Sequence, residues 1–152
     1  MQLSLFADYS LRVLLYTAAN GERWCTSDEV SASYRVSRHH IVKVVNALQH
    51  HGYLETVRGR GGGFRLAQSP EAVNIGEVVR RTESTLALVE CFDPATNTCP
   101  LAPACGLKGV LREASTAFLA ALDRYSLADL IRKPQWNARI VSIGRRGAHL
   151  NR

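Results

Sequence analysis

The feature that most constrains this chain is a pair of helical segments separated by one residue. A short helix is predicted over residues 26–35, with Thr26 or Ser27 as its cap. Ser37 can then cap a longer helix that ends at Gly52. Two helices joined by so tight a turn form a helix-turn-helix. The apolar residues of the second helix share one face: Ile41, Val44, Val45 and Leu48.

The hydrophobic pattern changes after Gly52 from the helical period to alternation. Residues 53–57 alternate along a predicted strand, and the run FRLA at 64–67 resumes the alternation after RGRGGG. Two such runs around a glycine-rich tip indicate a β-hairpin. A helix-turn-helix followed directly by a hairpin is a winged helix. We therefore predict a mainly α-helical fold with one small β-hairpin.

Further helices are predicted on both sides of this unit. Apolar residues at helical spacing indicate a helix over 3–20, and Asn74 with Glu77 can cap another through residue 81. A helix of about five turns over 107–125 carries an apolar stripe along its whole length. Ser126 and Asp129 have the spacing of a capping box that opens a last short helix.

This pattern divides the chain into four parts. Residues 1–82 form the winged helix-turn-helix domain, and 83–106 form an irregular loop, because its prolines and small residues favour neither helix nor strand. Residues 107–133 hold the long helix and the short helix after it. Residues 134–152 show little periodicity, and we predict a basic, flexible tail.

The positive charge is distributed unevenly. The formal net charge is +6, yet residues 130–152 alone carry 6 Lys or Arg and no Asp or Glu. The overall charge is therefore weak support for a nucleic-acid partner. A sharper signal lies between Arg35 and Arg65, where six basic residues face the single acid Glu55.

The sequence also bears on the compartment. Charged residues interrupt every apolar run before the roughly 18 residues that a membrane span needs. The first 20 residues lack a basic start and carry Asp8 and Arg12 where a signal peptide would be apolar. We expect a cytoplasmic protein with no membrane partner.

The helix-turn-helix and the wing together predict a surface for double-stranded DNA. The start of the second helix of this motif enters the major groove, where arginine pairs with guanine and histidine or lysine reach bases or phosphates. Glycines around the wing arginines remove side-chain bulk and allow entry into a minor groove. A dinucleotide-binding glycine motif is excluded, since Phe64 replaces its last glycine. The predicted DNA-contacting residues are Ser37, Arg38, His39, His40, Lys43, Arg58, Arg60 and Gly61.

Three cysteines lie in the irregular loop. Cys91, Cys99 and Cys105 are separated by seven and five residues, whereas Cys25 lies far away in sequence. Disulfides are disfavoured in the cytosol, and the close cysteine pairs of structural zinc sites are missing. The spacing suits iron–sulfur ligands first, with reactive thiols or bystander cysteines as alternatives. We expect Cys25 to be a small, partly buried side chain.

Three thiolates leave one position of a cubane cluster without a cysteine ligand. No cysteine or histidine follows Cys105 closely. The fourth ligand would then be an oxygen donor, a small molecule or water, or a group from another subunit. Within the chain the candidate oxygen donors are Asp8, Glu90 and Asp93. No histidine or aspartate is spaced to activate a loop thiol, so we do not expect an enzyme.

Five segments together resemble the iron–sulfur winged-helix repressors of the NsrR, IscR and RirA group. They are LSLFADYSLRVLLY, YRVSRHHIVKVVNALQHHGYLETVRGRGGGFRLA, NIGEVVRRTE, ECFDPATNTCPLAPACGLKGVL and FLAALDRYSLADLI. They span roughly residues 1–131 in the expected order. The likeness within this group is greatest to the nitric-oxide-sensing NsrR branch. IscR has a histidine shortly after the third cysteine, where this chain has Lys108.

The resemblance implies a homodimeric repressor of a palindromic operator, released when nitric oxide attacks its cluster. It implies that the helix 107–125 is the dimerisation helix and that Cys91, Cys99 and Cys105 hold an iron–sulfur cluster, expected as 4Fe–4S with 2Fe–2S as the alternative. An aspartate of the NsrR pattern matches Asp8, which becomes the expected fourth ligand, reaching across the dimer. The loop is also similar to that of RirA, so an iron- or redox-responsive regulator is the alternative. Cys25 and the basic tail are departures from this resemblance.

Overall fold

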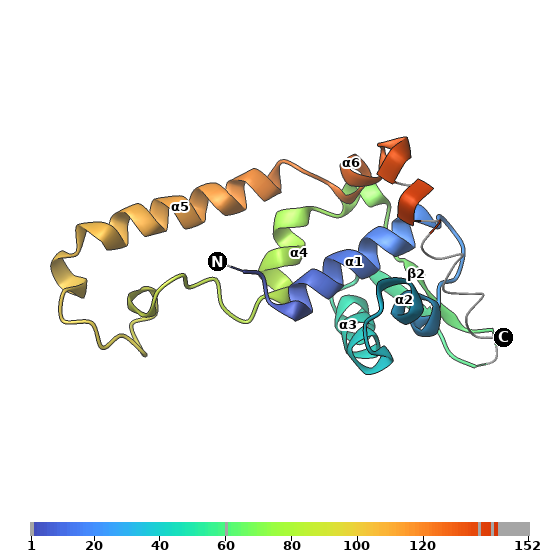
Figure 1. Cartoon of the computed structure of the whole chain (residues 1–152), viewed down its shortest axis with the longest axis horizontal. Coiled ribbons are helices and arrows are strands. Elements are labelled where there is room, and N and C mark those ends of the chain that lie inside the picture. The colour runs from blue at the N-terminus through green and yellow to red at the C-terminus, as the bar shows by residue number, and fades with distance from the viewer. Residues whose placement is uncertain (1, 60, 137, 141, 143–152) are drawn as a thin grey trace.

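The computed structural model describes residues 2–59, 61–136, 138–140 and 142. Arg60 and residues 143–152 lie outside this set. Figure 1 shows a globular part, which contains the winged helix, and an arm formed by α5 and the loop before it. The helices are α1 (Leu5–Ala19), α2 (Ser27–Tyr34), α3 (Arg38–His50), α4 (Ile75–Thr82), α5 (Gly106–Asp123) and α6 (Leu127–Ile131), and the strands are β1 (Leu54–Val57) and β2 (Gly63–Leu66).

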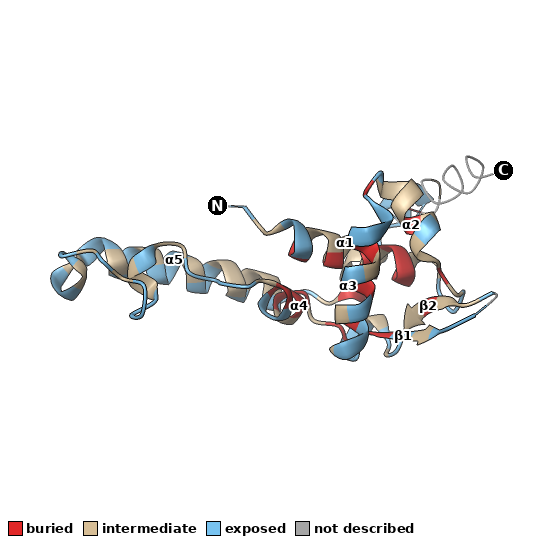
Figure 2. Cartoon of the chain, turned by 90° about the horizontal axis from the view of Figure 1, so that it is seen from below, coloured by how far each residue is buried: buried red, intermediate tan, exposed pale blue. Residues whose placement is uncertain are grey.

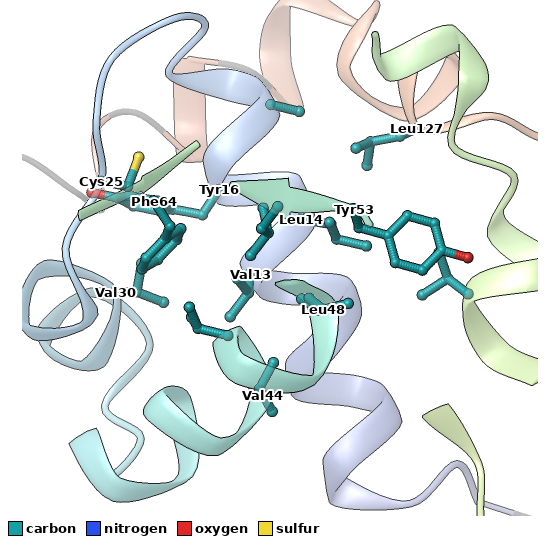
Figure 3. Packing of buried hydrophobic residues seen from close by; sticks show 14 of the residues in the cluster. Val13, Leu14, Tyr16, Cys25, Val30, Val44, Leu48, Tyr53, Phe64 and Leu127 are labelled. Atoms are coloured by element: carbon teal, nitrogen blue, oxygen red, sulfur yellow. The ribbon is translucent and has the colours of Figure 1, made fainter. Parts of the chain in front are cut away.

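The core lies between α1 and the helix-turn-helix. α1 packs against α3, α4 and α6, and it contributes Val13 and Leu14, both fully buried. The apolar face predicted for α3 is buried against it, and Figure 3 shows Val44 and Leu48 pointing into this cluster. Burial of such side chains stabilises the fold by about 1.5–3 kcal/mol each. α3 is thus held by its inner face, which leaves its outer face free.

The predicted capping residues start the helices where expected. Thr26 and Glu29 form a reciprocal capping box at α2, and the Ser37 hydroxyl accepts a hydrogen bond from the His40 amide at α3. Asn74 caps α4, and α6 also begins with the predicted box. These side chains bind backbone N–H groups that have no partner within the helix.

The turn between α2 and α3 depends on Arg35. This residue ends α2 with φ of 55°, a left-handed conformation that is uncommon for a side chain with a Cβ. The Val36 amide donates to the Ser31 carbonyl at 3.2 Å, and the Ser31 hydroxyl donates to the Val36 carbonyl at 2.6 Å. These bonds hold the chain in the tight turn that the sequence predicted.

The wing is an antiparallel hairpin with a third segment paired to it. Leu54 pairs with Leu66 and Val57 with Gly63, which confirms the predicted hairpin. The backbone of Cys25 also exchanges two hydrogen bonds with Phe64, each 2.8 Å long. A Cβ on Gly63 would meet the Cys25 carbonyl oxygen, so only glycine fits there. This pairing ties the wing to the start of α2, and no local sequence pattern indicates it.

α5 extends away from the globular part (Figure 1). The loop before it contains two single-turn 3₁₀ helices, Glu90–Phe92 and Ala102–Ala104, where no regular structure was predicted. No α5 residue is buried, and Figure 2 shows the helix intermediate or exposed along its length. Leu107 and Val110 are 63% and 62% exposed. The predicted apolar stripe is therefore largely uncovered at its beginning, whereas Leu122 near its end packs against the core.

The C-terminal end of α5 is fixed to α4 by several bonds. Asp123 pairs with Arg80 through two 2.6 Å contacts, one to each carboxylate oxygen. The Asn74 side-chain amide donates to the Asp123 carbonyl at 2.7 Å. A Cβ on Gly76 would collide with the Asp123 side chain. We call this set of contacts the α4–α5 joint.

The structure describes part of the segment that was predicted as a flexible tail. Residues 134–136, 138–140 and 142 are helical, and Ile140 is 8% exposed and belongs to the hydrophobic core. Ile140 thus packs on an apolar surface that periodicity does not reveal, and the flexibility of residues 134–152 stays a prediction. The remainder of the predicted tail, 143–152, lies outside the described residues. No helix of the described part is long and apolar enough to cross a membrane.

Candidate DNA-binding surface and cysteine loop

The predicted base-contacting residues lie at the exposed start of α3. Ser37 is the N-cap, and Arg38, His39, His40 and Lys43 all have exposed side chains. The His39 and His40 rings lie 6.2 Å apart, and His40 also lies 6.1 Å from Tyr9 of α1. The start of the helix points its N–H groups outward as well. This end of α3 can therefore bind an anionic backbone and present side chains to base edges.

The wing carries the second group of predicted residues. Arg58 is exposed, and the turn after it closes with a 3.0 Å bond from the Gly62 amide to the Gly59 carbonyl. Gly59 and Gly61 have φ of 102° and 81°, so the tip requires glycine at these positions. Arg60 lies outside the described residues. The described tip has little side-chain bulk, as a minor-groove contact requires.

An acidic residue that was not among the predicted site residues lies beside this surface. Asp28 in the first turn of α2 places its Oδ1 2.6 Å from Nε of Arg38. Both side chains remain largely exposed, at 58% and 64%. Acidic residues are favoured in the first turn of a helix, and the tight turn brings the start of α3 close to the start of α2. The sequence signal for this contact was therefore the acidic residue in the first turn of α2, the helix before α3.

The three loop cysteines are free thiols in the irregular segment. Cys91 lies in the first 3₁₀ turn, Cys99 follows in the loop, and Cys105 is the N-cap residue of α5. All three are partly buried, and none forms a disulfide. Within the described part of the chain, no three His, Cys, Asp or Glu side chains converge into a metal-binding group. The structure thus places three soft donors on one loop without bringing them together.

The predicted fourth ligand Asp8 is engaged in α1. Its Oδ2 lies 2.7 Å from Arg12 Nη2, and its Oδ1 accepts a 3.0 Å hydrogen bond from Arg12 Nε. This i,i+4 pair gives the Asp8 carboxylate a partner on its own helix. α1 belongs to the globular part, whereas the start of α5 lies at the far end of the arm (Figure 1). Asp8 does not meet the cysteines of its own chain.

The other two oxygen candidates take part in local loop contacts. Glu90 accepts hydrogen bonds of 3.3 Å from the Thr98 hydroxyl, and Asp93 accepts one of 2.9 Å from the Ala95 amide. The Glu90–Thr98 contact connects the neighbours of Cys91 and Cys99. Both carboxylates therefore have structural roles within the loop.

Cys25 differs from the loop cysteines. Its side chain is fully buried beside Phe64 in the core, as Figure 3 shows. Burial raises the pKa of the Cys25 thiol from 9.0 to about 12. A neutral, inaccessible thiol is neither a metal ligand nor a nucleophile. The expectation of a small buried side chain is confirmed, and burial is more complete than predicted.

The donor set can be compared with the chemistry of an iron–sulfur centre. Such clusters are held by cysteine thiolates, and this loop supplies three cysteines without a competing disulfide. The loop also lacks strands and α-helices that would fix the thiols apart. The residues therefore fit an iron–sulfur group in ligand type and number, with one position left for a different ligand.

Comparison with protein families gives one long match. The family Rrf2, described as "Iron-dependent Transcriptional regulator", matches residues 3–133. A regulator from Bacillus subtilis named HTH-type transcriptional regulator NsrR is 48% identical over 136 residues, which is 89% of this chain and 93% of the relative. A protein of the same name from Shouchella clausii is 52% identical over 132 residues, covering 86% of this chain and 89% of that protein.

Solved structures confirm the winged-helix fold. CymR, titled the global cysteine regulator of B. subtilis, aligns with a TM-score of 0.68 and 23% identity, covering 86% of this chain and 95% of that one. IscR from T. potens aligns with a TM-score of 0.67 and 20% identity over 87% of each chain. At these identities the likeness shows the fold alone.

Proposed function

Because this chain belongs to the Rrf2 family of transcriptional regulators, we propose that it is a dimeric repressor that carries an iron–sulfur cluster and leaves its operator when nitric oxide attacks that cluster. One observation carries the proposal. The segment with three free cysteines joins α4 directly to α5, and the far end of α5 is fixed back onto the winged helix by the α4–α5 joint. A change in the loop would therefore reach α4 by two routes. One is the chain that leaves the C-terminal end of α4, and the other is α5 with the α4–α5 joint.

The DNA-binding part of the proposal rests on α3 and the wing. Arg38, His39, His40 and Lys43 would enter the major groove, and Arg58 and Gly61, with Arg60 beside them, would contact the minor groove. Two copies of this surface would read a palindromic operator whose half-sites lie about one helical turn, ~34 Å, apart. Recognition would then depend on the spacing and tilt of the two α3 helices.

The sensing part rests on the cysteine loop. We assign Cys91, Cys99 and Cys105 as cluster ligands, with Asp8 of the second subunit as the fourth. When bound, a 4Fe–4S or 2Fe–2S group would supply iron that reacts with nitric oxide. Asp8 must release Arg12 to take this role, since the two side chains are paired in the structure. When the three thiols bind a common centre, they would hold the loop in one arrangement. When that centre is lost, the loop would be free to rearrange.

An iron-responsive regulator is the second candidate function. The family description, "Iron-dependent Transcriptional regulator", favours it directly. Both functions use the same residues, so no contact in this chain separates them. They differ in the signal: nitric oxide releases the operator in the first case, and iron withdrawal does so in the second.

Replacement of Cys99 by alanine tests the proposal. The full-length protein is purified without oxygen, and its iron, sulfide and visible absorbance are measured. Its affinity is measured for a duplex that the wild-type protein selects from a random library. We expect Cys99→Ala to lose the absorbance and to weaken binding to that duplex by roughly 5- to 150-fold, the usual range of coupling between two sites.

The control is Cys25→Ala, which removes a cysteine outside the loop. It should retain iron, absorbance and DNA affinity, with its folding checked by thermal melting. Wild-type protein that contains no iron, or a colourless Cys99→Ala protein with full affinity, would contradict the cluster assignment. Addition of nitric oxide in one sample and an iron chelator in another then distinguishes the two signals.

A further inference from the structure

The start of α3 carries the cation Arg38 without an acidic residue of its own. Arg38, His39 and His40 occupy its first turn, which contains no acidic residue. The N-terminal end of a helix is also the positive end of its dipole, so a cation is disfavoured there. Asp28 of α2 is the acid that offsets this charge, with its Oδ1 2.6 Å from Arg38 Nε.

This ion pair is too exposed to contribute much to folding. The side chains of Arg38 and Asp28 are 64% and 58% exposed, and exposed pairs add little stability. Among the described residues, Asp28 forms no other ion pair. The main consequence of the contact is therefore the position in which it holds the Arg38 guanidinium.

The contact is made through Nε of Arg38. Nε is the guanidinium nitrogen nearest the carboxylate, and the terminal nitrogens of a guanidinium can form the fork that matches two acceptors of guanine. The carboxylate also lies beside the surface that DNA would approach, where it repels phosphates. Contacts to phosphate supply most non-specific binding, whereas contacts to base edges supply sequence preference.

We propose that Asp28 is a specificity-determining residue, which orients Arg38 toward a base edge and disfavours its use as a phosphate contact. The inference rests on the proposed DNA-binding function and adds a residue outside α3 and the wing. Asp28 touches no DNA atom in this account. It acts through Arg38 and is a positioning residue.

The test compares two duplexes by fluorescence anisotropy over a range of salt concentrations. One is the duplex selected by the wild-type protein, and the other is a scrambled duplex of the same length. In Asp28→Asn we expect tighter binding to the scrambled duplex. The ratio of selected to scrambled affinity should fall roughly five- to tenfold, within the discrimination that one bidentate base contact provides. The control Glu71→Gln removes the same charge at an exposed position outside this surface and should leave the ratio unchanged.

A second pair of variants tests whether Asp28 acts through Arg38. In an Arg38→Ala background, adding Asp28→Asn should not lower the ratio further. An unchanged ratio in Asp28→Asn, an equal fall in Glu71→Gln, or a further fall in the Arg38→Ala background would each overturn the inference. Wild-type protein that binds both duplexes equally would overturn the proposed DNA-binding function and this inference with it.

Discussion

At the scale of single residues, burial separates the four cysteines into two kinds. Cys25 lies in the core with its backbone paired to Phe64, whereas Cys91, Cys99 and Cys105 are partly exposed on the loop. The thiolate is the reactive form of cysteine, and burial disfavours it. Position in the fold therefore decides which thiols are available for chemistry.

Alkylation of the metal-free, reduced protein tests this difference. At about pH 8, iodoacetamide should modify the three loop cysteines and leave Cys25 unmodified until denaturant is added. Burial raises the pKa of Cys25 from 9.0 to about 12. As the pH rises, the unfolded chain therefore loses the Cys25 proton before the folded chain does, and the free energy of unfolding should fall between these two pKa values. Peptide mass mapping of the alkylated protein identifies which cysteines were modified. Rapid modification of Cys25 in the native protein would contradict its buried role.

At the scale of elements, the α4–α5 joint connects the arm to the winged helix. The backbone bonds from the Ile75 amide to the Tyr125 carbonyl and from the Leu127 amide to the Val73 carbonyl measure 3.0 and 2.8 Å. The Arg80 guanidinium, by hydrogen bonding, lowers the pKa of the Asp123 carboxyl. The ion pair is therefore retained at pH values above the ordinary pKa of an aspartate. It is lost as the pH falls through the lowered pKa of Asp123. We expect a joint of this kind to couple a movement of α5 to α4.

Substitution Asp123→Asn tests the role of the joint. The ratio of operator affinities of the metal-loaded and metal-free proteins should move toward one, because α5 and α4 are coupled less tightly. Allosteric ratios usually lie between roughly 5 and 150. Titrations of both forms with the selected duplex measure it. The neighbouring substitution Arg124→Ala should leave the ratio near its wild-type value. An unaltered ratio in Asp123→Asn would show that the ion pair does not transmit the change.

At the scale of the whole molecule, the apolar stripe of α5 is largely uncovered at its beginning, although Leu122 near its end packs against the core. Leu107 and Val110 are mostly exposed, and Phe118 and Leu122 are only partly buried along the same face. A continuous apolar stripe at helical spacing is typical of a helix that packs against another helix. We expect that helix to be α5 of a second copy.

Substitution Val110→Glu tests the proposed dimer. A charge in the stripe should shift the protein to monomer in sedimentation velocity experiments, because an unpaired buried carboxylate is strongly unfavourable at an interface. The substitution Thr116→Glu places the same charge on the opposite, exposed side of α5 and should leave the dimer intact. Monomeric wild-type protein, or a Val110→Glu protein that remains dimeric, would contradict the assignment of this face.

Much of the fold could be predicted from local sequence. The caps at Ser37 and Asn74, the stripe of α5 and the change of period after Gly52 depend on residues close together in the chain. Each of these features depends on contacts within one or two helical turns or across one hairpin. The helices and the wing therefore followed from the order of residues, and so did the exposed basic start of α3.

The contacts between distant segments could not be predicted in this way. The backbone pairing of Cys25 with Phe64, the pairing of Asp28 with Arg38 and the burial of Ile140 each join residues that local periodicity does not relate. The sequence by itself determined which side chains are available: three loop cysteines and a basic helix start. Only the tertiary structure decided which of them are buried, paired or exposed, because that depends on how the packed helices bring distant parts of the chain together.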